Sequence, residues 1–233
     1  MVLFENLNNM TVEEVASAVY NNIVSGLVGI HNNPTISIDQ LSDEVVATRE
    51  AVIFEWWKKG ILQKGDLLAA INCIEVDCKD LTKCCKVVGA TPQHHFEIPQ
   101  LIPSLGDEAV YWVGAADRSQ KYKVYMTPSQ IKYHKYKKRA EVKPYVYIEP
   151  AKNEHGMYDG WIYNLPFVKN IALVGIFRDP RDLQKIGCDG NCDNASGDIG
   201  TITREVIDRL TKQWIYFYRQ ALQLPHVNDQ TAR

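Results

Sequence analysis

Long hydrophobic runs are missing from this chain of 233 residues. The longest apolar stretches, such as residues 170–177, are far shorter than the roughly 20 residues that a membrane-spanning helix needs. Residues 1–6 also lack the basic start and apolar core of a secretory signal, so we expect synthesis in a reducing, intracellular compartment. In that setting, six cysteines in a chain of this length predict reduced thiols rather than a disulfide framework.

A strong charge of one sign is also missing. The chain carries 26 basic and 28 acidic side chains, for a formal net charge of -2. This balance excludes a global attraction to nucleic acid or to an anionic membrane, so any electrostatic function must come from local clusters. With 45% hydrophobic and 23% charged residues, the composition is that of a folded globular protein with a core of its own.

Motifs of the common catalytic sites are absent as well. The sequence has no Gly-x-Ser-x-Gly elbow and no glycine-rich phosphate loop. The pairs Glu13-Glu14 and Asp43-Glu44 lie in early turns of expected helices, where the helix dipole accounts for them. His155-Gly156 and Asp159-Gly160 indicate turns. We therefore expect no catalytic residues and no enzyme. An enzyme with a dispersed site would need a pocket in which His134 or His155 meets a carboxylate.

Two N-terminal helices are predicted from their capping boxes. Thr11 and Glu14 form the first box, and Ser37 and Gln40 form the second. After each box, apolar residues recur at spacings of three and four, as on one face of a helix. These residues are Val12, Val15, Ala16, Val19 and Ile23, then Ile38, Leu41, Val45, Val52, Ile53 and Trp56. Lysines followed by glycine at 58–60 mark the end of the second helix, and a short third helix is predicted over 66–72.

The pattern changes after about residue 85, where prolines punctuate a loop-rich passage. Five runs rich in β-branched and aromatic residues then predict strands of an antiparallel sheet. These runs are 109–113, 122–126, 145–148, 161–163 and 171–177. A final helix is expected over 201–222, with an apolar stripe of Val206, Leu210, Trp214, Phe217 and Ala221.

The expected fold is therefore α+β, with N-terminal helices packed beside a mainly antiparallel β-sheet and a long C-terminal helix with an extended tail. We divide the chain into a helical part over 1–90, a β-rich part over 91–186, and a loop, helix and tail over 187–233. We expect the three parts to form one compact unit.

A cysteine cluster could bind metal. Cys73, Cys78, Cys84 and Cys85 lie close together and could surround a tetrahedral zinc ion. The spacing is poor, because the first pair is too widely spaced and the adjacent second pair cannot easily face one ion. We therefore favour small buried side chains in a reduced protein and assign no metal ligand and no cofactor. A zinc-stabilised binding module that uses these four cysteines is the alternative function.

The strongest local charge lies where lysines alternate with tyrosines. Its basic residues are Lys132, Lys135, Lys137, Lys138 and Arg139. Such a stretch has three interpretations. It could be a solvated edge strand whose lysines prevent edge-to-edge pairing, an interface with an acidic protein, or a contact to a nucleic-acid backbone.

The last helix has more apolar surface than one buried face needs. Beyond the stripe that contains Trp214, its opposite side carries Ile215 and Tyr218, and Tyr216 lies between. A helix that is apolar on more than one side is buried on more than one side. We therefore predict an interface with a partner or neighbouring subunit at Trp214, Ile215, Tyr216 and Tyr218.

The order of these segments resembles that of the head-to-tail connector, or adaptor, ring proteins of tailed bacteriophages. Three segments are similar to virion structural proteins of the crAss-like phages: LSDEVVATRE at 41–50, AINCIEVDCKDL at 70–81 and VGIFRDPRDL at 174–183. The resemblance implies a non-enzymatic virion protein, made in the host cytoplasm, without cofactor or membrane contact. It implies a homo-oligomeric ring, commonly of twelve subunits, that joins the portal to other tail or connector proteins and lines the DNA channel.

Overall fold

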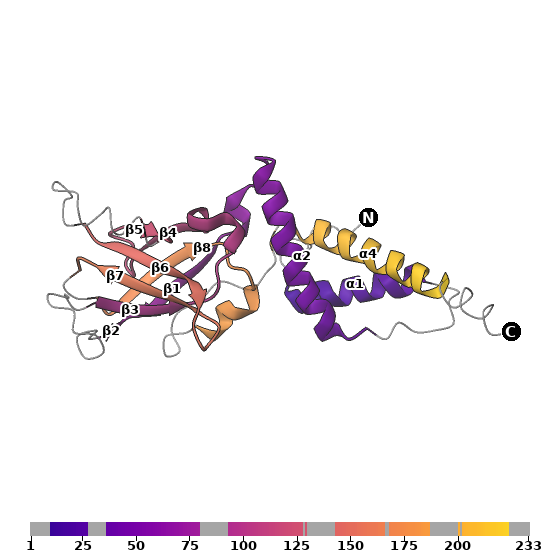
Figure 1. The fold of residues 1–233 in the computed structure, drawn as a ribbon, viewed down its shortest axis with the longest axis horizontal. Coiled ribbons are helices and arrows are strands. Elements are labelled where there is room, and N and C mark those ends of the chain that lie inside the picture. Colours follow the sequence, from indigo (N-terminus) through magenta and orange to yellow (C-terminus); the bar gives the residue numbers. More distant parts are fainter. Residues whose placement is uncertain are drawn as a thin grey trace. The chain divides into compact units, whose positions relative to one another are not determined.

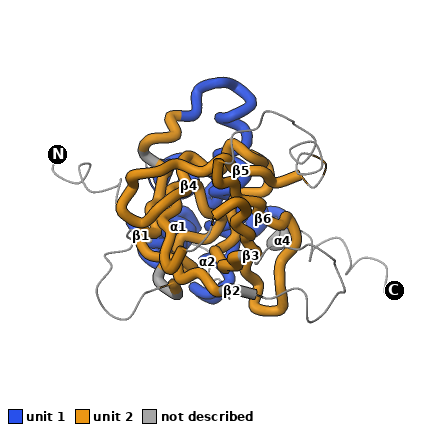
Figure 2. The backbone as a smooth tube through the Cα atoms, turned by 90° about the vertical axis from the view of Figure 1, so that its left-hand side faces the viewer, with its two compact units in different colours: residues 1–62, 198–233 blue, residues 63–197 orange. Residues whose placement is uncertain are grey.

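The computed structural model describes residues 10–27, 36–79, 93–127, 129, 143–165, 168–186, 200 and 202–223. Their fold is α+β, as expected, with helices at both ends of the chain and strands between them (Figure 1). Two compact units are distinguished (Figure 2): unit 1 comprises residues 1–62 and 198–233, and unit 2 comprises residues 63–197. No helix of the described ranges combines the length and hydropathy needed to cross a bilayer.

The described residues of unit 1 form three helices that pack against one another: α1 (Val12–Gly26), α2 (Ile38–Lys58) and α4 (Thr203–Gln223). The predicted capping box of α1 is present, with the Thr11 amide donating to Glu14 Oε2 at 2.8 Å and the Glu14 amide donating to Thr11 Oγ1 at 3.3 Å. Ser37 caps α2 by accepting from the Gln40 amide at 3.1 Å. The local sequence therefore sets where both N-terminal helices begin.

The core of unit 1 comes from all three helices. It includes Val12, Val15, Val19, Ile23, Leu41, Val45, Val52, Ile53, Val206 and Leu210, each with at most 1% of its surface exposed. Ile38 was predicted to belong to the apolar face of α2, and this prediction is wrong. The residue lies at the first position of the helix and is 46% exposed. Helices α1 and α4 approach closely where a Cβ atom at Gly26 would lie 2.5 Å from Ile215 Cδ1.

The part of unit 2 that the structure describes forms two sheets. The first has the order β1-β8-β4, with β1 at Ala69–Glu75, β8 at Asn170–Gly175 and β4 at Val110–Ala115. The second has the order β2-β3-β7-β6-β5, and its strands are Asp77–Lys79, Gln93–Ile98, Tyr158–Tyr163, Tyr145–Lys152 and Lys123–Tyr125 in that order. All strand pairs are antiparallel except β5–β6, which is parallel. Short 3-10 helices occupy Lys64–Leu67, Pro103–Ala109 and Pro180–Lys185.

Alternation along the strands separates a core face from an outer face in the five-stranded sheet. On β3, Phe96 and Ile98 are buried at no more than 1% exposure, and Gly160 of β7 faces the Phe96 ring across the ladder. A Cβ atom at Gly160 would lie 2.2 Å from Phe96 Cζ, so only glycine leaves room for this ring. The neighbouring residues His95 and Glu97 lie on the other face.

Most strand predictions are confirmed, and several other local predictions are wrong. Each of the five predicted runs overlaps an observed strand. The helix predicted over 66–72 is wrong, because this segment ends a 3-10 turn and then pairs with β8 as β1. Strand β3 lies in the passage predicted to be loop-rich, and Asp159-Gly160 lies within β7 instead of a turn. Gly156 does lie in a turn, with a φ angle of 76°.

The expectation of reduced cysteines is contradicted at one position. Cys73 on β1 is 7% exposed and takes part in a disulfide bond. The sulfur that it bonds to lies outside the described side chains.

Candidate functional site: the aromatic surface of helix α4

Helix α4 changes character along its length. In its first half, Val206, Ile207 and Leu210 are buried against α1 and α2, and this half completes the core of unit 1. In its second half, Tyr216 is 64% exposed and Phe217 is 57% exposed. The same helix therefore has a core segment and a segment that offers apolar surface to solvent.

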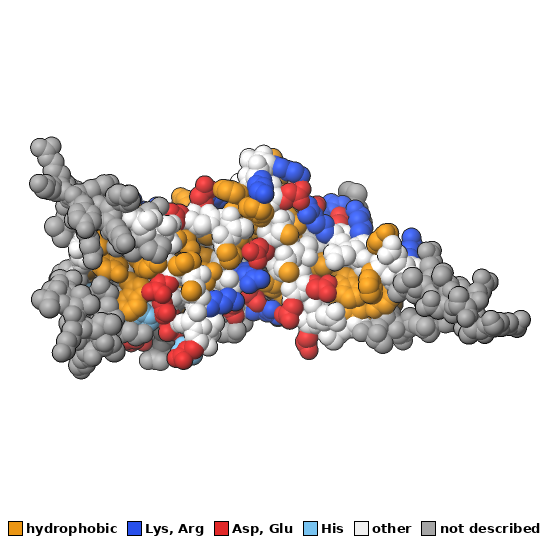
Figure 3. Space-filling model, viewed as in Figure 1, with side chains coloured by type: hydrophobic (Ala, Val, Ile, Leu, Met, Phe, Trp, Pro, Cys, Tyr) orange, Lys and Arg blue, Asp and Glu red, His pale blue; other side chains and the backbone are white. Residues whose placement is uncertain are grey.

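Three aromatic rings meet in the second half, at positions that share one side of the helix. The ring centroids of Trp214 and Phe217 are 5.7 Å apart at 78°, those of Trp214 and Tyr218 are 5.8 Å apart, and those of Phe217 and Tyr218 are 6.0 Å apart at 76°. Spacings of three and four residues produce these contacts. We call these three residues, together with the neighbouring exposed residue Tyr216, the α4 aromatic surface. Figure 3 shows apolar side chains gathered over the end of unit 1 where the later part of α4 lies in Figure 1.

The second half of α4 differs from the sequence prediction in which side is buried. Phe217 was assigned to the buried stripe, yet it is mostly exposed. Ile215 and Tyr218, assigned to the opposite side, are half-buried, and Ile215 contacts the end of α1 near Gly26. Burial and the proximity of Tyr20 on α1 raise the pKa of Tyr218. The buried side of α4 is therefore rotated from the one predicted.

Polar contacts hold the helix that carries the rings. Trp214 Nε1 donates a hydrogen bond to Glu44 of α2. Arg209 forms ion pairs with Glu205 at 2.7 Å and with Glu55 of α2 at 2.6 Å. The pKa of Glu55 lies below its ordinary value because Glu55 accepts hydrogen bonds from Lys59, which is the larger cause, and from Arg209. The aromatic surface is therefore presented on a helix that polar contacts hold against α2.

This arrangement is suited to binding. Large aromatic side chains exposed together are typical of the centre of a protein–protein interface, where they supply much of the binding energy. Isolated exposed apolar residues need no explanation, whereas two adjacent exposed rings on one helix offer apolar surface that a partner could cover.

The remaining predicted site residues are placed only in part. The basic residues from Lys132 to Arg139 lie outside the described residues, as do Cys84 and Cys85. For Cys78 only the backbone is described. Cys73 is in a disulfide and offers no thiolate, which removes one of the four ligands of the predicted zinc module.

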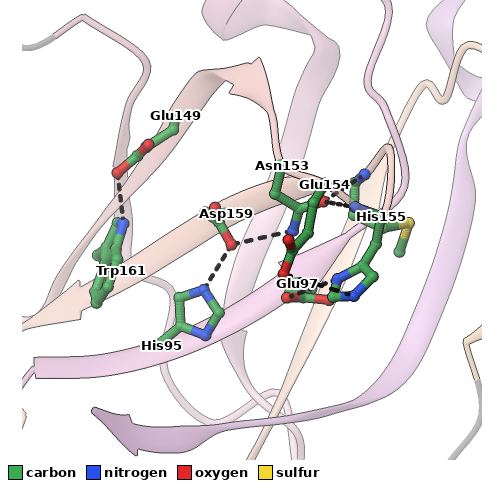
Figure 4. A network of polar contacts seen from close by, with 9 residues as sticks. His95, Glu97, Glu149, Asn153, Glu154, His155, Asp159 and Trp161 are labelled. Atoms are coloured by element: carbon green, nitrogen blue, oxygen red, sulfur yellow. Dashed lines mark hydrogen bonds and ion pairs between the residues drawn. The ribbon is translucent and has the colours of Figure 1, made fainter.

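A second polar site was missed by the sequence interpretation. His95 and Glu97 of β3 and Asp159 of β7 gather on the outer face of the five-stranded sheet, next to Asn153 and His155 (Figure 4). His155, singled out earlier, does approach a carboxylate, with Nδ1 3.8 Å from Glu97 Oε1, but its side chain is 65% exposed. The alternation His-x-Glu in a strand was the available signal, and Asp159 could be added only by knowing that β3 pairs with β7.

A helical unit that exposes aromatic residues, joined in one chain to a β unit, is suited to binding other proteins. The sequence profile of the crAss-like phage family described as phage tail ring protein 2 matches residues 19–225, and the chain belongs to this family. It is therefore a structural protein of the phage tail, with a role in the virion. None of the curated proteins compared with the chain matches it.

Proposed function

We propose that this protein assembles into a homo-oligomeric ring in the portal-to-tail connector, where the ring joins head to tail and lines the DNA channel. Membership of a tail ring family supports self-assembly. Tyr216 and Phe217 are exposed on a helix whose other half is core, and this observation links the proposal to particular residues. The proposed occupant of the α4 aromatic surface is a second copy of this chain.

A ring requires a heterologous contact, in which one surface of a subunit meets a different surface of the next. The α4 aromatic surface supplies one side of such a contact. Val24 at 38% and Ile38 at 46% exposure are apolar residues elsewhere in unit 1 that could form the other side. A stable interface buries about 800 Å² on each partner, so the aromatic rings would be its centre and not its whole extent.

The finer features of this role rest on the resemblance to connector proteins. We propose twelve subunits, a portal neighbour and a basic stretch, from Lys132 to Arg139, that faces channel DNA or an acidic neighbouring ring. Contact with DNA would be non-specific and would weaken steeply with salt, because it depends on the release of counterions from phosphates.

The decisive experiment images the purified full-length chain. Negative-stain images and light scattering, recorded with the chain alone and with its portal, should show closed rings, and the images give the subunit number. A chain that stays monomeric at high concentration with portal present would refute the ring proposal. Closed rings of another subunit number would refute only the count of twelve.

A further inference from the structure

A cluster of one imidazole and two carboxylates lies on the outer face of the five-stranded sheet. His95 Nε2 donates to Asp159 Oδ1 at 2.7 Å, and one potential ligand atom each from His95, Glu97 and Asp159 lies within 4.8 Å of the others. The geometry points to a binding site for a divalent transition-metal ion of the zinc class, with these three side chains as ligands. Neither the tail ring family nor the proposed assembly assigns such a site.

The strand register brings the three ligands together. Glu97 and Asp159 are direct partners across the β3–β7 ladder, and His95 lies two residues before Glu97 on the same face. Side chains at directly opposed positions are about 5 Å apart at their Cβ atoms, and both strands are internal to the sheet. The ligand positions are therefore set by rigid backbone, which is the preorganisation that a metal site needs.

The imidazole is held in place from both sides. The His95 side chain is 3% exposed, and its ring lies 4.7 Å from the Trp161 ring, the residue opposite it in the register. The Trp161 indole is itself fixed, because Nε1 donates to Glu149 Oε1 at 2.8 Å. Figure 4 shows His95 turned toward Asp159 from its strand. Little side-chain entropy remains for the imidazole to lose on binding an ion.

The charge of the cluster favours a cation. Among the described residues, the ion-pair partners of Glu97 and Asp159 are histidines and not lysine or arginine. Asp159 is 23% exposed and Glu97 is 38% exposed. The two carboxylates gather negative charge on this face, which a divalent ion would neutralise. The proton shared between His95 Nε2 and Asp159 Oδ1 occupies the place where the ion would bind both atoms, so binding releases that proton.

The distances and donor atoms select the class of ion. Zinc lies about 2.0–2.2 Å from nitrogen and oxygen ligands, so two ligands at the tetrahedral angle are about 3.5 Å apart. The three ligand atoms lie within 4.8 Å of one another, and a rotation of the more exposed Glu97 side chain would bring its carboxylate to that separation. A buried imidazole among carboxylates suits zinc and its neighbours, whereas calcium and magnesium take oxygen ligands only.

The turn between β6 and β7 supports the site. Asn153 Nδ2 donates to Asp159 Oδ1 at 3.3 Å, while Asn153 Oδ1 accepts from the His155 and Met157 amides, each at 3.0 Å. This turn places His155 Nδ1 3.8 Å from Glu97 Oε1. His155 is therefore the protein group best placed to fill the fourth position, which water would otherwise occupy.

The test titrates Zn²⁺ into the EDTA-treated full-length chain by calorimetry. We expect one ion per chain, no displacement by excess Ca²⁺, and a loss of affinity in Asp159→Asn that exceeds the roughly 10- to 100-fold typical of removing an outer partner. The matched control is Glu154→Gln, which removes an 89% exposed carboxylate from the same turn and should leave the affinity unchanged. Unchanged binding in Asp159→Asn, or no binding by the parent chain, would overturn the assignment.

Two further measurements separate this site from the cysteine cluster and from misfolding. The variant Cys84→Ser/Cys85→Ser should retain full Zn²⁺ affinity. With Co²⁺ as probe, the parent chain should show visible bands without the near-ultraviolet sulfur-to-metal band that thiolate ligands produce, and the appearance of that band would refute the proposed ligands. The near-ultraviolet circular dichroism spectrum of Asp159→Asn should match that of the parent chain. A matching spectrum would show that the variant loses binding without losing its fold.

Discussion

The substitution Phe217→Gln separates assembly from folding. Phe217 is 57% exposed in the isolated chain, so a glutamine there removes no core contact of comparable size. Surface substitutions of this kind usually change the free energy of unfolding by no more than about 0.5 kcal/mol. If the α4 aromatic surface is the subunit interface, the same change removes the centre of that interface and the ring should dissociate.

The size of the effect follows from the area that assembly would cover. An aromatic side chain presents roughly 200 Å² in all, so the exposed 57% of Phe217 amounts to roughly 115 Å². At about 25 cal/mol per Å² of apolar surface, covering it contributes roughly 3 kcal/mol to each subunit contact. Because every 1.4 kcal/mol is about a tenfold change in affinity, Phe217→Gln should weaken each contact by about a hundredfold.

The assay is light scattering over a concentration series, with thermal unfolding of the dissociated chain as the measure of fold. Tyr111→Gln is the matched control, because Tyr111 is an aromatic residue of unit 2 with a similar exposure of 60%. Rings should persist in Tyr111→Gln and be lost in Phe217→Gln at equal concentration. Rings that persist equally in both variants would refute the α4 aromatic surface as the interface. Loss of rings in both variants would show that the effect on assembly is not specific to α4.

Three further outcomes are expected. In Gly160→Ala the new methyl meets the Phe96 ring at about 2.2 Å, so chemical denaturation should show a loss of roughly 1–3 kcal/mol of stability, and an unchanged midpoint would contradict the packing. Burial raises the pKa of Tyr163 from 10.0 to about 12, so its contribution to stability is present below pH 10 and is lost as the pH rises through 12. Tyr163→Phe should reduce that alkaline loss in a pH series of unfolding curves. The Lys59 hydrogen bond and, next to it, the Arg209 hydrogen bond hold the pKa of Glu55 below 4.5. The stability difference between parent and Arg209→Gln should therefore be present above pH 4.5 and shrink as the pH falls through the lowered pKa.

Local signals were enough to predict the helix starts and the later strands. Thr11 and Ser37 cap their helices by contacts within three residues, so the sequence nearby contains everything that decides them. Strand β1 was missed because its alternative as a helix is locally acceptable. Its state is decided by pairing Ala69 with Gly175, about a hundred residues later in the chain.

The candidate sites also could not be predicted from the local sequence. Periodicity placed Phe217 in the buried stripe, but the close approach of α1 at Gly26 turns Ile215 inward and leaves Phe217 outside. The cluster of His95 and Asp159 depends on the register between β3 and β7, which no spacing along the chain encodes. In both cases the residue types were visible in the sequence, and only the packing of distant segments decided which of them meet.

If the α4 aromatic surface is the subunit interface, the division of α4 into a core half and an exposed half makes folding and assembly depend on one another. Leu210 and Trp214 lie on consecutive turns of α4. Leu210 is buried in unit 1, and Trp214 is hydrogen-bonded to Glu44 of α2. A neighbour bound at Phe217 would therefore hold in place the same helix that completes the core, and its binding free energy would add to the stability of unit 1. Conversely, loss of the α2 anchor would free the aromatic rings to adopt many orientations and raise the entropic cost of assembly. The exposed rings and the buried half of α4 are thus two parts of one structural element, which explains why apolar residues continue around the helix beyond the face that its own unit buries.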